Sequence, residues 1–181
     1  LYNCQYGDNG STPTEVTTKD MREVVKQLKG ADGIMFEPRI AASRDIGTEP
    51  VRAAYWCTLH TDLEVDLEEL PNFQPVHKYA HPAMAKPGEI GALGNLRILA
   101  SSVGSLISGS PDVYNMFCSA RDAYGSVQID KGMVQHIFND AKSGGTSNPL
   151  WQYSTQGWKA FAGNKILNDS WIVRARATLD S

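Results

Sequence analysis

The residues best suited to metal chemistry are His60 and Asp62, which stand two positions apart. Imidazole and carboxylate groups can share a zinc or iron ion, and His77 and His81 are further histidines that could join them. In an extended chain His60 and Asp62 would lie on the same face. Asp62 also precedes leucines at helical spacing, where a carboxylate is typical of a helix cap. The spacing favours this structural role and leaves a small metal-dependent enzyme as the alternative.

Two other patterns could support catalysis, and each has a simpler interpretation. Cys57 stands three residues before His60, but a reactive thiolate needs a partly exposed, electropositive setting, and the apolar surroundings of Cys57 predict burial. Gly88, Gly91 and Gly94 are spaced as in a phosphate-binding loop, yet no strand precedes them and no Lys-Ser/Thr pair follows. The sequence therefore predicts no nucleophile and no phosphate site.

Acidic and aromatic residues form two further groups. The acidic residues alternate with leucine and valine, which indicates a solvated face; they are Glu64, Asp66, Glu68 and Glu69. The tryptophans could stack on bases, but that mode also needs a positive groove; they are Trp56, Trp151, Trp158 and Trp171. The net charge of −3 favours packing in a core or interface instead. Aromatic residues on a strand scaffold also leave a carbohydrate-binding module as an alternative.

The composition indicates a folded domain with no membrane or disulfide signature. A chain of 181 residues, 41% of them hydrophobic, is long enough to bury one substantial core. The three cysteines are widely spaced and odd in number, which favours synthesis in a reducing cytoplasm. No apolar run approaches the roughly 18 to 20 residues that span a bilayer. We therefore expect no membrane partner and no cofactor.

Hydrophobic periodicity predicts a mixture of strands and a few short helices. Thr17 and Asp20 have capping-box spacing before an amphipathic helix that ends at Gly30. A central strand is expected at 51–59, where both faces are mainly apolar, and a short helix capped by Asp62 follows. The residues expected to hold these helices to the core are Met21, Val24, Val25, Leu28, Leu63, Leu67 and Leu70. Further strands are expected at 96–100, 113–119, 127–129 and 134–138.

Three stretches outside these elements are expected to have distinct structures. We expect residues 1–16 to form a peripheral extension, and the proline-rich residues 71–91 to form a long irregular surface loop. Residues 144–149 predict a sharp turn, followed by an extended segment and a strand at 171–178 that are joined into a hairpin through 167–170. On that last strand Arg174 and Arg176 share the face opposite Val173, Ala175 and Ala177.

Several of these motifs, taken in order, resemble a known family. They are Lys78-Tyr79-Ala80, Gly88-Glu89-Ile90-Gly91 followed by Arg97, Asp122-Ala123-Tyr124-Gly125, Gly-Gly-Thr-x-x-Pro-Leu at 144–150, Gly157-Trp158-Lys159 and Lys-Ile-Leu-Asn-Asp-x-Trp-x-Val-Arg at 165–174. Over roughly residues 18–178 the chain is similar to the major capsid proteins of N4-like tailed bacteriophages. This resemblance implies the HK97-like capsid fold, an α+β architecture of mostly antiparallel strands with a few short helices.

The resemblance also implies a domain plan and a function. Residues 17–142 would be an A-domain-like core, and 143–181 a P-domain-like turn and hairpin; the N-terminal arm, extended loop and much of the spine helix are not identified. The chain would be a structural protein, not an enzyme, that assembles with itself into the icosahedral head enclosing double-stranded DNA. Decoration, portal or scaffolding proteins would be its other partners, and DNA only a non-specific neighbour. The virion capsid would be its location, after synthesis in the host cytoplasm. Candidate subunit contacts are Arg174, Arg176, Tyr79 and Glu89.

Overall fold

A computed structural model describes residues 1–42, 44, 48–128, 134–143 and 148–179. The chain divides into two compact units, Leu1–Ala123 with Asn168–Ser181 and Tyr124–Leu167. The division into compact units does not fall at 142/143, the boundary that the resemblance implies. The strands on either side of that position pair with each other, which places both within the second unit.

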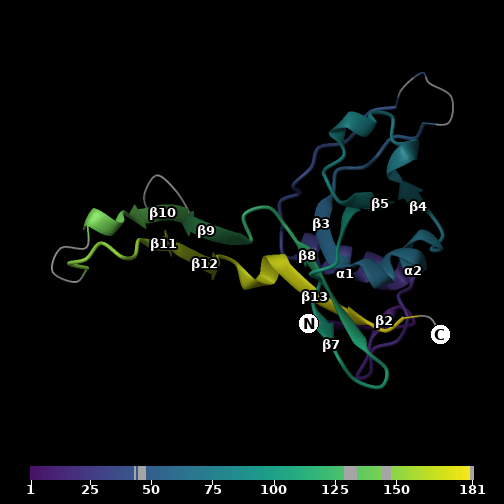
Figure 1. Ribbon diagram of the computed structural model, residues 1–181. Coiled ribbons are helices and arrows are strands. Elements are labelled where there is room, and N and C mark those ends of the chain that lie inside the picture. The colour runs from purple at the N-terminus through teal and green to yellow at the C-terminus, as the bar shows by residue number, and fades with distance from the viewer. Residues whose placement is uncertain (43, 45–47, 129–133, 144–147, 180–181) are drawn as a thin grey trace. The chain divides into compact units, whose positions relative to one another are not determined.

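The first unit, which we call the sheet unit, is built on a nine-stranded sheet (Figure 1). Its strands, in the order in which they lie side by side, are β2 (Asp8–Asn9), β1 (Tyr2–Gln5), β13 (Ile172–Ala177), β8 (Val113–Ser119), β3 (Tyr55–His60), β6 (Leu96–Ser101), β5 (Glu89–Leu93) and β4 (Phe73–Pro75), with β7 (Leu106–Ile107) paired to β8. Only β1–β13 and β3–β6 are parallel among these pairs. The mostly antiparallel sheet and the central position of β3 confirm the sequence predictions.

Helix α1 (Thr18–Gly30) packs its apolar face into the core of the sheet unit. The predicted capping box is present, because Asp20 accepts a hydrogen bond from the backbone of Thr17 while the Thr17 side chain accepts from the backbone of Asp20. The side chains predicted to anchor this helix are all buried: Met21, Val24, Val25 and Leu28. The helix end at Gly30 is also confirmed.

The predicted short helix forms as a 3₁₀ turn, Thr61–Leu63, followed by α2 (Glu64–Glu68). Leu63 and Leu67 are fully buried, and Leu70 packs against the same core. The cap differs from the prediction, because His60 and not Asp62 holds the N-cap position. The Nδ1 atom of His60 accepts a hydrogen bond from the backbone N–H of Asp62 at 3.2 Å.

Part of the N-terminal stretch 1–16, where a peripheral extension is predicted, belongs to the sheet and the core. Strand β1 pairs in parallel with β13, and the side chains of Tyr2 and Cys4 are buried in the core. The Tyr2 hydroxyl donates to Asp20 Oδ1 at 3.0 Å, which ties β1 to the first turn of α1. A four-residue strand between polar turns has too little periodicity to be recognised in sequence.

The stretch 71–91 is more ordered than the irregular surface loop predicted there. It contains β4, two single 3₁₀ turns at Val76–Lys78 and Pro82–Met84, and the start of β5. Tyr79 and Ala80 are buried in a second small apolar cluster. The other buried members of this cluster are Ile40, Val51 and Ala92.

The C-terminal strands are extended as predicted, but the expected hairpin through 167–170 does not form. Strand β13 pairs with β1 and β8, and a 3₁₀ turn, Asp169–Trp171, leads into it. Where the second unit leaves the sheet unit and returns, the backbone N–H of Asn168 donates to the carbonyl of Ala123 at 3.1 Å. The preceding strand, β12 (Ala162–Ile166), pairs with β9 (Tyr124–Gln128) instead. The turn predicted at 144–149 lies largely outside the described residues.

The second unit, which we call the arm, consists of two antiparallel strand pairs (Figure 1). Strand β9 (Tyr124–Gln128) pairs with β12 (Ala162–Ile166), and β10 (Val134–Asn139) pairs with β11 (Thr155–Ala160). Every residue of β10, β11 and β12 is exposed. The arm thus has no core within the described chain.

Candidate functional site

The most unusual surface of the chain is one face of the arm. The register of β10 and β11 places Val134 opposite Ala160, His136 opposite Trp158, and Phe138 opposite Gln156. Because side chains alternate between the faces of a strand, these six share one face. We call them the arm face. The exposed fractions are 59% for Val134, 58% for Phe138 and 71% for Trp158.

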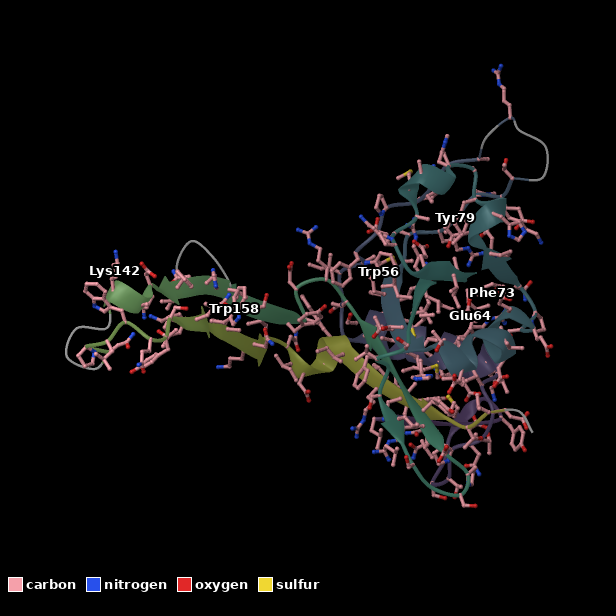
Figure 2. The ribbon with its side chains drawn as sticks, in the orientation of Figure 1. Trp56, Glu64, Phe73, Tyr79, Lys142 and Trp158 are labelled. Carbon is pink, nitrogen blue, oxygen red and sulfur yellow. The ribbon has the colours of Figure 1, made fainter. Side chains whose placement is uncertain are left out.

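The arm face is locally ordered and open to solvent in the described chain. The His136 and Trp158 rings pack at a centroid distance of 4.6 Å, and Gln156 Nε2 lies 2.6 Å from His136 Nε2, so the face is locally ordered. Figure 2 shows Trp158 on the arm. An isolated two-stranded hairpin is only marginally stable in water, and gains stability when an apolar face is buried. Exposed contiguous apolar side chains of this kind mark interaction surfaces.

A second feature is a buried ionic network around Arg97 on β6. Arg97 is fully buried, and its Nη2 donates to the carbonyl of Pro38 at 3.3 Å. Its Nη1 lies 3.8 Å from Glu37 Oε2, and its Nε lies 3.9 Å from Glu89 Oε1. These ion pairs are longer than direct hydrogen bonds, so Nε and Nη1 have none among the described residues. The positive charge of Arg97 is thus balanced by the carboxylates of Glu37 and Glu89, neither of which is within hydrogen-bond distance.

Tyr79 completes this network. Its hydroxyl donates to Glu89 Oε1 at 2.8 Å, and its ring lies 5.9 Å from the guanidinium carbon of Arg97. Burial, followed by the hydrogen bond to Glu89, raises the pKa of Tyr79 well above its usual range, so the hydroxyl remains a donor. The network joins Tyr79 with Glu89 and Arg97, which come from two separate motifs of the family resemblance. Its evident role is to hold those segments together.

This geometry bears on the predicted subunit contacts. Tyr79 and the side chain of Glu89 are buried within the single chain, so the sheet unit would have to open before either could contact a neighbour. Arg174 and Arg176 do share one face of β13, opposite Phe117 and Asn115 of β8. Both side chains are half-buried rather than exposed to solvent. Arg176 Nε is a buried donor without a hydrogen bond in the described chain.

The predicted metal ligands do not converge. His60 Nδ1 lies 3.2 Å from Asp62 Oδ2, which also accepts a hydrogen bond from the Tyr114 hydroxyl at 3.0 Å. His77 and His81 belong to the 71–91 stretch. Among the residues that the structure describes, no group of three or more His, Cys, Asp or Glu side chains could hold a metal ion.

Cys57 is buried, as predicted, and faces another thiol. Its Sγ lies 3.0 Å from Cys118 Sγ on the adjacent strand, directly opposite in register. The hydrogen bond to Cys57, together with burial, raises the pKa of the Cys118 thiol. A fully buried thiol pair lacks the exposure that a nucleophile needs.

The glycines at 88, 91 and 94 shape the β4–β5–β6 corner. Gly88 and Gly94 have positive φ angles of 80° and 63°. A Cβ on Gly91 would lie 2.4 Å from the Phe73 ring and 2.6 Å from the Gln74 carbonyl, so a side chain cannot fit.

No described helix is long and apolar enough to cross a bilayer.

Comparison with solved structures gives the fold a context. The chain is similar to a chain in the head structure of Helicobacter pylori bacteriophage KHP40, with a TM-score of 0.62 and 12% identity over 99% of this chain. It is also similar to one in the acidic stable capsid structure of Helicobacter pylori bacteriophage KHP30, with a TM-score of 0.57 and 8% identity over 92% of this chain. This is a fold found in bacteriophage heads.

The chain spans 60% and 58% of the length of those two chains. No family model and no curated protein matches the sequence.

Neither the arm face nor the burial of Arg97 was predicted from the sequence. A signal for the second was present, because Arg97 is the single charge in the apolar run Leu96–Ala100.

Proposed function

We propose that this chain is a structural subunit of a bacteriophage head, assembling with copies of itself into an icosahedral shell around double-stranded DNA. The observation that carries the proposal is the arm face: exposed apolar side chains on a hairpin that has no core of its own. The similarity to chains of two phage heads supports the same role. Function would thus reside in interfaces between copies, and no catalytic role is assigned.

The finer assignment to the HK97-like fold of N4-like phages is also part of this proposal. Its support is the ordered set of sequence motifs, two of which supply the Tyr79, Glu89 and Arg97 network. The sheet unit would be the A-domain-like part. Arg174 and Arg176 are proposed to meet acidic groups of a neighbouring subunit, since Arg suits bidentate carboxylate pairing at interfaces. Decoration, portal or scaffolding proteins would be further partners in the virion.

The proposal is tested by sedimentation velocity and electron microscopy of the purified full chain over a range of concentrations. Concentration-dependent rings or closed shells are the expected result. A chain that stays monomeric throughout would contradict the proposal. Elemental analysis and glycan binding on the same sample address the alternatives, because stoichiometric zinc or iron would favour an enzyme, and sugar binding by monomers a carbohydrate-binding module.

A further inference from the structure

A groove of about 770 Å³ lies along helix α1 in the sheet unit. One wall is the exposed side of α1, and the other is formed by the turn between β5 and β6 together with Pro50 and Arg52. Val25 and Leu93 contribute an apolar floor. The groove therefore combines an apolar base with polar walls, a composition that is common in binding sites.

The walls of this groove are strongly basic. Arg22, Lys26 and Lys29 recur at i, i+4 and i+7, so they form a row along one face of α1. Arg52 adds a fourth cation from the opposite wall, and none of the described residues that line the groove is acidic. This concentration of positive charge occurs on a chain whose net charge is −3.

The internal partners of these cations are weak competitors. Lys26 Nζ lies 3.0 Å from Glu23 Oε2, but the Lys26 side chain is 75% exposed, and exposed pairs of this kind contribute little. Lys29 Nζ donates to the amide oxygen of Asn95 at 3.2 Å. Neither contact places a carboxylate inside the groove.

The same chain carries a complementary surface on α2. Val65 and Glu68 of α2 stand at i and i+3, and Glu69, the helical C-cap residue, stands at i+4, so the three share one face. The opposite side, with Leu63 and Leu67, is fully buried. Val65 is 63% exposed, and in the described chain neither Glu68 nor Glu69 takes part in an ion pair. An exposed valine beside two free carboxylates matches an apolar floor between cationic walls.

We propose that the α1 groove binds the acidic face of α2 from a second copy of this chain. Glu68 and Glu69 would pair with the cations of the α1 row, and Val65 would contact the apolar floor. DNA phosphates could use the same cations, but they would leave the apolar floor and the exposed Val65 without partners. The inference rests on the proposed self-assembly and specifies one contact within it.

A charge-swap experiment tests this contact in the full chain. The groove variant carries Arg22→Glu and Lys29→Glu, and the helix variant carries Glu68→Lys and Glu69→Lys. Each should weaken self-association in low salt by about tenfold or more, because like charges would then face each other across the interface. The variant with all four changes should recover most of the loss, since it restores opposite charges with the signs exchanged.

The matched control carries Lys78→Glu and Arg121→Glu, two exposed cations of the sheet unit outside the groove. It has the same change in net charge as the groove variant and should self-associate like the wild type. Circular dichroism of each variant establishes that its fold is intact.

A second measurement identifies the contact directly. Isotope-labelled and unlabelled chains are mixed and treated with a zero-length carbodiimide, and mass spectrometry should find cross-links between Lys26 or Lys29 of one copy and Glu68 or Glu69 of another. If the wild type does not self-associate, the proposed function and this contact both fail. If it does, and neither the groove variant nor the cross-links behave as stated, only this contact fails. A groove variant that self-associates normally but loses duplex DNA binding would replace α2 with DNA as the occupant.

Discussion

Removal of the Trp158 ring gives the sharpest test of the arm face. The ring is 71% exposed in the single chain, and its described neighbour across the strand pair is His136. Trp158→Ala should therefore change the stability of the monomer by about 1 kcal/mol or less, the range of an exposed cross-strand pair. Its larger effect should appear only when copies associate.

The size of that effect follows from the area still open to solvent. At 71% exposure, Trp158 has on the order of 150 Å² left to bury, or about 4 kcal/mol at about 25 cal/mol per Å². If a neighbour covers only half of that area, the loss is about 2 kcal/mol for each contact, which is about 30-fold in the association constant.

Sedimentation velocity over a concentration series measures this constant for wild type and variant. Tyr6→Ala is the matched control, because Tyr6 is an aromatic residue of the sheet unit that is 70% exposed. It removes a similar exposed ring from a different surface and should leave association unchanged. Equal association by the two variants, or a Trp158→Ala monomer that has unfolded, would refute the assignment of the arm face as an interface.

Three further substitutions test other parts of the structure. Leu67→Ala empties a fully buried site under α2 and should lower the free energy of unfolding by about 2 to 5 kcal/mol in urea titration; a loss below about 0.5 kcal/mol would contradict its place in the core. Arg97→Ala should cost about 3 to 5 kcal/mol in the same assay, because it leaves Glu89 buried without its ionic partner; a neutral result would show that the network does not stabilise the fold. Replacing Arg174 and Arg176 with Gln should impair shell assembly seen by electron microscopy while the monomer stays folded. If the double variant assembles normally into empty shells and only the retention of DNA is lost, both residues would instead lie on the inner wall.

The parts of the fold that were predictable are those governed by local sequence. Thr17 and Asp20 mark the start of α1 because a capping box needs only residues three apart. Runs of strand-forming residues likewise located β6 and β8. Alternation between faces placed Val173 and Ala175 in the core. In each case the deciding interaction lies within a few residues of the pattern that reports it.

The failures concern pairing between distant segments. The expected hairpin at 167–170 did not form because β12 pairs with β9, and β13 with β1 and β8, which no local turn specifies. The burial of Arg97 likewise depends on Glu37 and Glu89, which lie far from it or on another strand. The arm face could not be recognised either, since an alternating apolar pattern predicts burial and does not say which chain supplies the cover.

The hydrogen bond between Asn168 and Ala123 makes the arm a replaceable insert. Along the chain the arm occupies the connection between β8 and β13, and each doubling of a loop adds only about 0.6 kcal/mol to its closure. The arm can therefore lengthen, shorten or change sequence while the sheet unit keeps its fold. In evolution such a design would let the arm vary without a new search for a stable core. In the laboratory, a short glycine link between Ala123 and Asn168 should give a folded core that has lost the arm face.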